Sequence, residues 1–165
     1  MTTDPSLRAD CSRCIGLCCI ALAFDRGPSF AFDKATGEAC PQLTASHRCR
    51  IHDHLEPAGM SGCAAYDCLG AGQLTTAMFA GLATAASPAT RRAMFRAFAV
   101  LREVQALRRA LGSRIGGELL EALAPTGGWT YQRVATLDLG AIRRLVRKHL
   151  DGPARDETVV ARQAS

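Results

Sequence analysis

The pattern of hydrophobic and polar positions divides this chain at residue 73. From Gln73 onward, apolar residues recur at the three- and four-residue spacing of amphipathic helices, whereas the preceding part holds short apolar stretches between turns. The clearest helical pattern begins at Ser87, an N-cap residue, has Pro88 at the first helical position, and ends at Gly112. Its apolar face is formed by Met94, Ala97, Phe98, Leu101, Val104, Leu107 and Leu111.

Two shorter helices are predicted after it. One covers residues 117–124 and ends at the turn residues 125–128. The other covers residues 138–150 and carries basic residues near its C-terminal end, where positive charge suits the helix dipole. Between them, we expect Trp129 and Tyr131 to lie in a loop or a short strand and to fill part of the core.

The N-terminal part predicts less regular structure. Residues 1–10 are expected to form a loose terminus, with Asp10 as the cap of a helix that begins at the first cysteine. Two β-compatible stretches, 20–24 and 29–32, flank the turn residues 26–28 and predict a small hairpin or an extended excursion.

Together these patterns predict a mainly α fold, in which a small irregular cysteine-rich metal-binding N-terminal region packs on a C-terminal helical region. The predicted boundaries are 1–72 for the cysteine-cluster region, 73–152 for the helical region and 153–165 for a disordered tail. With 165 residues, of which 48% are hydrophobic, the chain is long enough to bury a core. No stretch reaches the ~18 apolar residues of a membrane span, so we expect a soluble protein.

The cysteines carry the main chemical information. All eight lie within residues 11–68, and the first four form a C-x2-C-x3-C-C cluster. Thiolates are soft ligands that suit zinc and iron–sulfur centres, and eight of them would complete two four-ligand sites, or one site with thiols left over. The predicted metal ligands are Cys11, Cys14, Cys18, Cys19, Cys40, Cys49, Cys63 and Cys68.

Disulfides and scattered free thiols are the alternatives to metal binding. The first ten residues carry acids and a proline instead of the apolar stretch of a secretory signal, so we expect a cytoplasmic, reducing location. Cys18 and Cys19 are also adjacent, so each would need a separate disulfide partner. These observations favour metal binding over the two alternatives.

The local structure of the first cluster has two solutions. In a helix, Cys11, Cys14 and Cys18 fall within about 60° of one another and Cys19 widens the arc to about 140°, so one helix would present all four to one centre. Gly16 costs a helix up to ~1 kcal/mol relative to alanine, and metal sites often use loops instead. The sequence leaves both solutions open.

The two halves of the chain have opposite charge. Residues 1–72 contain six Lys/Arg and eight Asp/Glu, net −2, whereas residues 73–165 contain fourteen and seven, net +7. The arginines of the long helix are spread around it, so we do not expect nucleic-acid binding, and a protein partner stays open. His47, His52 and His54 are interpreted as bystanders, because eight thiols are available as ligands.

The motifs follow one another in a recognisable order: C-x2-C-x3-C-C, Cys40-Pro41-x-Leu43, Cys49-x-Ile51-His52, Pro57, Cys63 and Tyr66-x-Cys68. This order resembles the YkgJ-type cysteine-cluster proteins, a zinc- or iron-chelating family. More closely, about the first 75 residues are similar to the N-terminal block of actinobacterial pentapeptide-repeat proteins. The resemblance implies that the seven cysteines from Cys11 to Cys63 are metal ligands, with Cys68 matching the closer subgroup.

The resemblance implies little about activity. The C-terminal half lacks the A-(D/N)-L-x-x repeat, and although one branch of the family is associated with flagellin lysine methylation, no G-x-G-x-x-G-type cofactor loop is present. Our first hypothesis is a structural or accessory metal-binding protein that holds zinc or, slightly less favoured, an iron–sulfur cluster. The alternatives are an iron–sulfur-dependent redox or protein-methylating enzyme, and a metal- or redox-sensing regulator.

Overall fold

The protein is described by a computed structural model that covers residues 4–81 and 87–151. Over these residues it is mainly helical, as the sequence predicts, and contains isolated antiparallel bridges but no β-strand. Single 3-10 turns lie at Pro5–Leu7, Cys11–Arg13, His52–His54 and Gly112–Arg114. The α-helices are Leu17–Ala21 (α1), Ser61–Ala64 (α2), Ala71–Met78 (α3), Pro88–Leu111 (α4), Glu118–Leu123 (α5), Tyr131–Ala135 (α6) and Leu139–Asp151 (α7).

Helix α4 is the central element. The Ser87 hydroxyl accepts a hydrogen bond from the Thr90 N–H at 3.2 Å, which caps the first turn, and Pro88 follows at the first helical position. At the other end Gly112 adopts a positive φ of 54° and its N–H donates to the Arg108 carbonyl. Both predicted ends of this helix are therefore confirmed.

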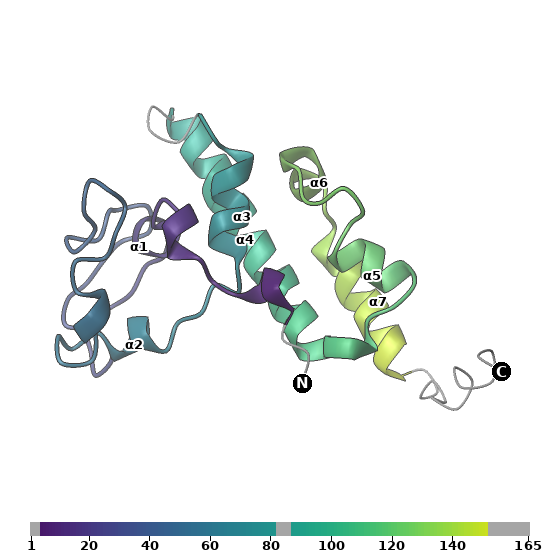
Figure 1. Ribbon diagram of the computed structural model, residues 1–165, viewed down its shortest axis with the longest axis horizontal. Coiled ribbons are helices and arrows are strands. Elements are labelled where there is room, and N and C mark those ends of the chain that lie inside the picture. Colours follow the sequence, from purple (N-terminus) through teal and green to yellow (C-terminus); the bar gives the residue numbers. More distant parts are fainter. Residues whose placement is uncertain (1–3, 82–86, 152–165) are drawn as a thin grey trace.

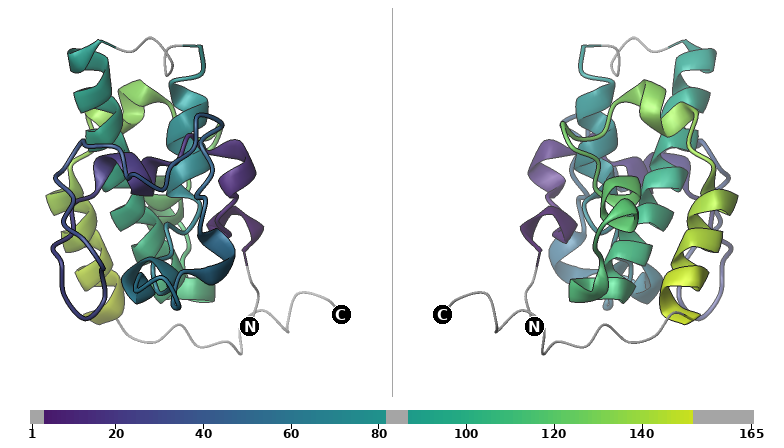
Figure 2. Two further views of the ribbon diagram at one scale, coloured as in Figure 1. Left: turned by 90° about the vertical axis from the view of Figure 1, so that its left-hand side faces the viewer. Right: turned by 90° about the vertical axis from the view of Figure 1, so that its right-hand side faces the viewer.

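Helices α3 and α4 lie side by side and separate two parts of the molecule. Figure 1 shows the irregular cysteine-rich part with α1 and α2 on one side of this pair and α5, α6 and α7 on the other, and the two views of Figure 2 agree. The apolar face of α4 contributes to two hydrophobic cores. Its first half packs in a core with Leu17, Ala21, Ala71, Phe79, Met94, Ala97, Phe98, Leu101 and Val134, and its second half in a core with Val104, Leu111, Leu119, Leu123, Ile142 and Val146.

The C-terminal helices follow the sequence pattern with one exception. Helices α5 and α7 lie where they are predicted. Tyr131, however, begins helix α6 instead of lying in a loop or strand, because the Thr130 hydroxyl accepts from the Arg133 N–H at 3.3 Å and caps a new turn. Trp129 packs against both cores as expected, whereas the Tyr131 ring is 39% exposed and contacts Phe79 edge to face at 5.2 Å.

The excursion after α1 forms a hairpin-like loop without strands. Phe24 and Lys34 form an antiparallel bridge, with N–H to carbonyl distances of 3.0 and 2.8 Å, and Gly27 pairs with Phe30 at the tip. The rings of Phe24 and Phe30 stack with centroids 4.5 Å apart. Ile20, expected in the first β-compatible stretch, lies in α1 instead.

The expectation of a loose N-terminus is wrong for residues 4–10. Asp4 caps the 3-10 turn at Pro5–Leu7, and Gln73 of α3 donates to the Arg8 carbonyl at 2.8 Å and accepts from the Asp10 N–H at 3.1 Å. Helix α3 spans the predicted boundary between residues 72 and 73, and the predicted tail 153–165 lies outside the described residues. None of the described helices is long and apolar enough to cross a membrane.

A candidate metal site lined by cysteines

The C-x2-C-x3-C-C cluster is built from two short helical turns. The Asp10 carboxylate accepts from the Ser12 N–H at 2.9 Å and caps the 3-10 turn at Cys11–Arg13, which confirms the predicted cap. Gly16 then adopts a left-handed backbone with φ of 75° and starts α1, so the cluster is neither one helix nor an open loop. A side chain at Gly16 would also meet Leu43, whose Cδ1 lies 2.7 Å from the position of a Cβ.

The cysteine segments enclose a cavity of about 290 Å³ against α3 and α4. Its wall on the helical side includes Gly72 and Gln73 of α3 and Phe98 of α4. Chain segments far apart in the sequence therefore meet around one space. The cysteines that line it are Cys11, Cys14, Cys18, Cys19, Cys49 and Cys68.

A first thiol group consists of Cys11, Cys14, Cys18 and Cys68. The sulfurs of Cys14 and Cys68 both lie close to Gly72, at 2.9 and 3.5 Å from the position that a Cβ would take. Burial raises the pKa of Cys11, and the neighbouring sulfurs of Cys18, Cys14 and Cys68 raise it further. Burial also raises the pKa of Cys68, which the N–H groups of Gly72 and Gly70 partly offset.

A second thiol group consists of Cys19, Cys40, Cys49 and Cys63. The Cys40 N–H donates to the Cys19 carbonyl at 2.9 Å, and Leu43 connects Cys40 to Cys49 through a hydrogen bond to the first and an antiparallel bridge to the second. Burial raises the pKa of Cys63, with further contributions from Cys18, Cys40 and Cys49. Cys40 and Cys63 belong to this group but do not line the cavity.

The adjacent residues Cys18 and Cys19 join the two groups. Their sulfurs lie 3.9 Å apart. A hydrogen bond from the Cys19 thiol lowers the pKa of Cys18 to about 7, and the same bond raises the pKa of Cys19. Cys18 is therefore the thiol that ionises most readily in this pair, and thiolates are the form that binds metals.

The eight thiols are gathered but do not form a finished ligand cage. All eight are free cysteines, without a disulfide between them. Among the described residues, no set of three or more His, Cys, Asp or Glu side chains is arranged to hold a metal ion as it stands. Binding an ion would therefore need the sulfurs to close in, which short turns and loops permit more readily than long helices.

The comparisons with known proteins found one relative of unknown function. The chain is 32% identical over 146 residues to the uncharacterized protein YybG of Bacillus subtilis. The match covers 88% of this chain, and the chain spans 52% of the length of YybG. No known family profile matches the sequence, and no solved structure matches the fold.

Two basic side chains, which the sequence pattern did not single out, lie beside the thiols. The Arg48 guanidinium donates to the carbonyls of Cys11 and Ser12, the latter at 2.9 Å, and so holds the first turn of the cluster. Lys34 is buried, and its ammonium donates to the carbonyls of Leu22 and Ala35. The position of Arg48 next to Cys49 in the sequence could have indicated its role. No neighbouring residue indicates a role for Lys34.

The electrostatics of Lys34 connect it to the second thiol group. Burial lowers its pKa, whereas the sulfurs of Cys40 and Cys19 and the carboxylate of Glu38 raise it, because nearby negative charge favours the charged ammonium. No ion pair with a carboxylate within 4.0 Å is found for it among the described side chains. A buried cation of this kind is suited to balance anionic sulfur ligands.

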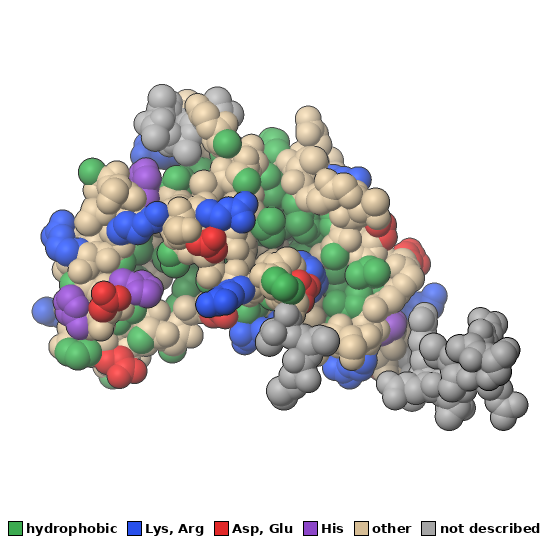
Figure 3. Space-filling view, in the orientation of Figure 1, with side chains coloured by type: hydrophobic (Ala, Val, Ile, Leu, Met, Phe, Trp, Pro, Cys, Tyr) green, Lys and Arg blue, Asp and Glu red, His purple; other side chains and the backbone are tan. Residues whose placement is uncertain are grey.

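The histidines lie at the surface of the cysteine-rich part. His52 and His54 are exposed and His47 is half-buried, with His47 and His52 at the edge of the cavity. Figure 3 shows histidine side chains on the outside of this part of the molecule, and Lys and Arg side chains spread across the same face without forming a single patch. The interpretation of the histidines as bystanders stays a prediction.

Proposed function

We propose that this protein binds metal through its eight cysteines, as zinc or an iron–sulfur cluster, in a structural or accessory role and in the reducing cytoplasm. The observation that carries the proposal is that six of the eight cysteines, from separate chain segments, line one cavity. Thiolate is the ligand shared by structural zinc sites and iron–sulfur clusters. The resemblance of the cysteine order to the YkgJ-type proteins supports the same conclusion.

We base a proposal for the number of ions on the two thiol groups. Each group holds four sulfurs, which is the ligand count of a closed zinc site and of an iron–sulfur cluster. We therefore infer two neighbouring centres that meet at the Cys18–Cys19 pair. Arg48 beside the first group and Lys34 beside the second supply positive charge, which favours the ionised thiols that a metal needs.

The structural role rests on how little apolar core the cysteine-rich part has. Its large buried apolar side chains are few, chiefly Leu17, Met60 and Leu69, whereas α4 is buried along most of its inner face. A structural zinc ion contributes roughly 10–16 kcal/mol of apparent binding free energy in small domains, which is coupled to folding. Metal binding would thus order the cysteine-rich loops, whose own apolar core is too small to do so.

Anaerobic purification followed by metal and acid-labile sulfide analysis tests the proposal. We expect metal bound in proportion to the protein, with zinc giving a colourless sample and a cluster giving a brown one with iron and sulfide. Cys14→Ser and Cys49→Ser should each lower the metal content, as members of different groups, whereas the exposed His54→Gln should not. Wild-type protein that purifies folded and metal-free, and takes up neither zinc nor iron, would refute the proposal.

Chelation tests the structural role separately. After metal removal, hydrogen exchange should increase within residues 10–70 more than within residues 88–150, because only the first segment depends on ligands for its order. The control is the same protein reloaded with metal, in which the original protection should return. Equal increases in both segments, or an unchanged thermal midpoint, would argue against a structural metal.

A further inference from the structure

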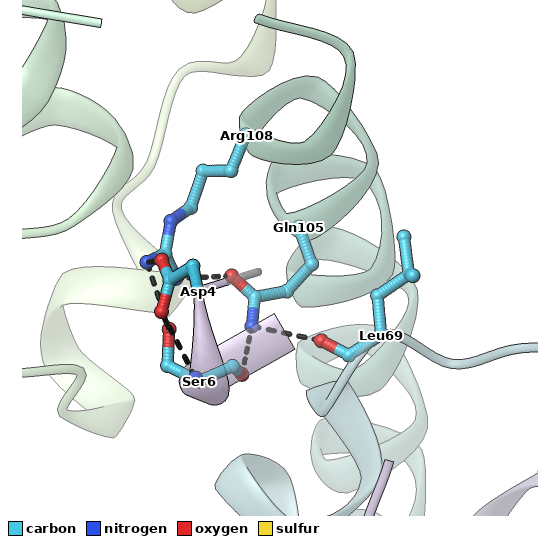
Figure 4. Close-up of polar contacts among 5 residues, drawn as sticks. All are labelled: Asp4, Ser6, Leu69, Gln105 and Arg108. Carbon is cyan, nitrogen blue, oxygen red and sulfur yellow. Dashed lines mark hydrogen bonds and ion pairs between the residues drawn. The ribbon is translucent and has the colours of Figure 1, made fainter. Parts of the chain in front are cut away.

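Gln105 is a polar side chain at the centre of the molecule. It lies on the inner face of α4 and is completely buried, with 0% of its surface exposed. Figure 4 shows its amide bridging two chain segments: Nε2 donates to the Leu69 carbonyl at 2.9 Å and to the Ser6 carbonyl at 3.2 Å. Its Oε1 accepts from Arg108 at 2.6 Å. These partners fix the orientation of the amide, because the two carbonyls accept only from the nitrogen.

The Leu69 carbonyl belongs to the turn that carries Cys68. Leu69 has a positive φ of 53°, a conformation that leucine rarely adopts, and Gly70 continues the turn with φ of 81° before α3 begins. Asp67 accepts from the Leu69 N–H at 2.8 Å, so this unusual residue is held at its N–H by Asp67 and at its carbonyl by Gln105. The turn fixed in this way aims Cys68 at Gly72 and the cavity.

The Ser6 carbonyl belongs to the segment that leads into Cys11. Arg108, one turn after Gln105 on α4, donates to the Asp4 carboxylate at 2.6 Å and to the Ser6 hydroxyl at 2.9 Å. The same helix therefore fixes the chain close to the first and the last cysteine of the first thiol group. This buried amide is costly to replace, because the Leu69 carbonyl would lose its hydrogen bond in a buried environment.

We propose that Gln105 is a positioning residue for Cys68, through which helix α4 sets the geometry and the metal affinity of the first thiol group. The effect on metal affinity rests on the proposed metal-binding function. The effect on the position of the Cys68 thiol does not. This positioning assigns a role to the helical half, which contributes no cysteine. Helix α4 holds the segment before Cys11 and the turn after Cys68 in fixed positions.

The first test measures thiol reactivity in the metal-free, reduced protein and does not depend on metal binding. In Gln105→Leu, alkylation by iodoacetamide, followed by peptide mass spectrometry, should accelerate severalfold at Cys68 and stay unchanged at Cys63. Gln105→Glu keeps the shape of the side chain and the Arg108 contact but removes the Nε2 donor, so it should show the same selective change. Gln132→Leu, at an exposed position on α6, is the matched control.

The second test separates positioning from general destabilisation by a double-mutant cycle. Substitutions that remove a group orienting a metal ligand lower metal affinity by about 10–100-fold, so Gln105→Leu should weaken Zn²⁺ binding by about tenfold or more in a chelator competition. In a Cys68→Ser background the same substitution should have almost no further effect, because its target is gone.

The outcomes are distinguishable. Selective acceleration at Cys68 together with a non-additive cycle supports the inference. Equal acceleration at all eight cysteines, an unchanged Cys68, or an additive cycle overturns it. If wild-type protein binds no metal while Cys68 still responds selectively, the proposed function fails but Gln105 remains a positioning residue for that thiol.

Discussion

Replacing Gly72 by alanine should change metal affinity and the stability of the metal-free protein in different ways. A Cβ at this position would lie 2.9 Å from the Cys14 sulfur and 3.5 Å from the Cys68 sulfur. The contact with Cys14 is too short, so its sulfur must move, which the side chain can do by rotating about its Cα–Cβ bond; the distance to Cys68 is an ordinary contact. The methyl group therefore occupies space that the first thiol group needs.

The magnitudes follow from the local structure. Gly72 lies in the first turn of α3 and does not have a positive φ, so alanine suits the backbone and gains at most about 1 kcal/mol of helix propensity. Crowding in a packed site costs about 1–3 kcal/mol, and rotation of Cys14 places this case at the low end. We expect the unfolding free energy of the metal-free protein to change by no more than about 1 kcal/mol.

Metal binding should be affected more strongly, because it needs the sulfurs in fixed positions. Displacing Cys14 should lower the affinity by about 10–100-fold, the range seen when groups that orient metal ligands are disturbed. This corresponds to about 1.4–2.8 kcal/mol of binding free energy. The effect on binding therefore exceeds the effect on folding.

Chelator competition measures the affinity, and urea denaturation of the metal-free protein measures the stability. The matched control is Gly27→Ala, at a position where nothing lies within 4 Å of the new Cβ and φ is not positive. Affinity in Gly72→Ala equal to that in wild type and in Gly27→Ala would show that Cys14 and Cys68 are not ligands of a common ion.

Three further predictions concern ionisation, the core and the surface charge. In the metal-free protein, Cys18 should be alkylated with a midpoint near pH 7, since hydrogen bonding lowers its pKa to about 7, and Cys19→Ala should move this midpoint toward the ordinary thiol value of 9.0; a midpoint near 9.0 in both would contradict the hydrogen bond. Leu101→Ala, at a fully buried core position, should cost about 2–5 kcal/mol in urea denaturation, against less than about 0.5 kcal/mol for Leu120→Ala, which is 48% exposed. In a gel-shift titration near physiological salt, nucleic-acid binding should be no tighter than roughly 10⁻⁴–10⁻⁶ M, and saturable sub-micromolar binding would restore the regulator hypothesis.

Ion pairs on the surface explain why we expect only weak nucleic-acid binding. Several basic side chains of the helical half are paired with acids: Arg143 with Glu103 at 2.6 Å and Arg144 with Asp138 at 3.6 Å, for example. A pair of this kind neutralises a charge that a phosphate would otherwise meet. Arg143 thus joins α7 to α4, whereas Arg108 and Arg109 of α4 pair with Asp4 and Asp67 of the N-terminal part.

Local chemistry in the sequence determined helices α4, α5 and α7 of the C-terminal half. The ends of α4 depend on Ser87, Pro88 and Gly112, whose capping preferences act over one turn, and the apolar spacing between them matches the buried face. The number and spacing of the cysteines likewise indicate a thiol site from the sequence alone. Both inferences use interactions between residues that are close in the chain.

Contacts between distant residues decided the remainder, and no local pattern encodes them. Residues 4–10 look like a free terminus, but Arg108 holds Asp4 from 104 positions away. The places of the thiols depend on where Gly16 bends the chain and on the turn at Leu69, which Gln105 supports from α4. Helical spacing alone placed Cys18 and Cys19 toward one centre. In the folded chain Cys18 lies near Cys11, Cys68 and Cys63, whereas Cys19 lies near Cys40 and Cys49, because these sulfurs come from separate segments.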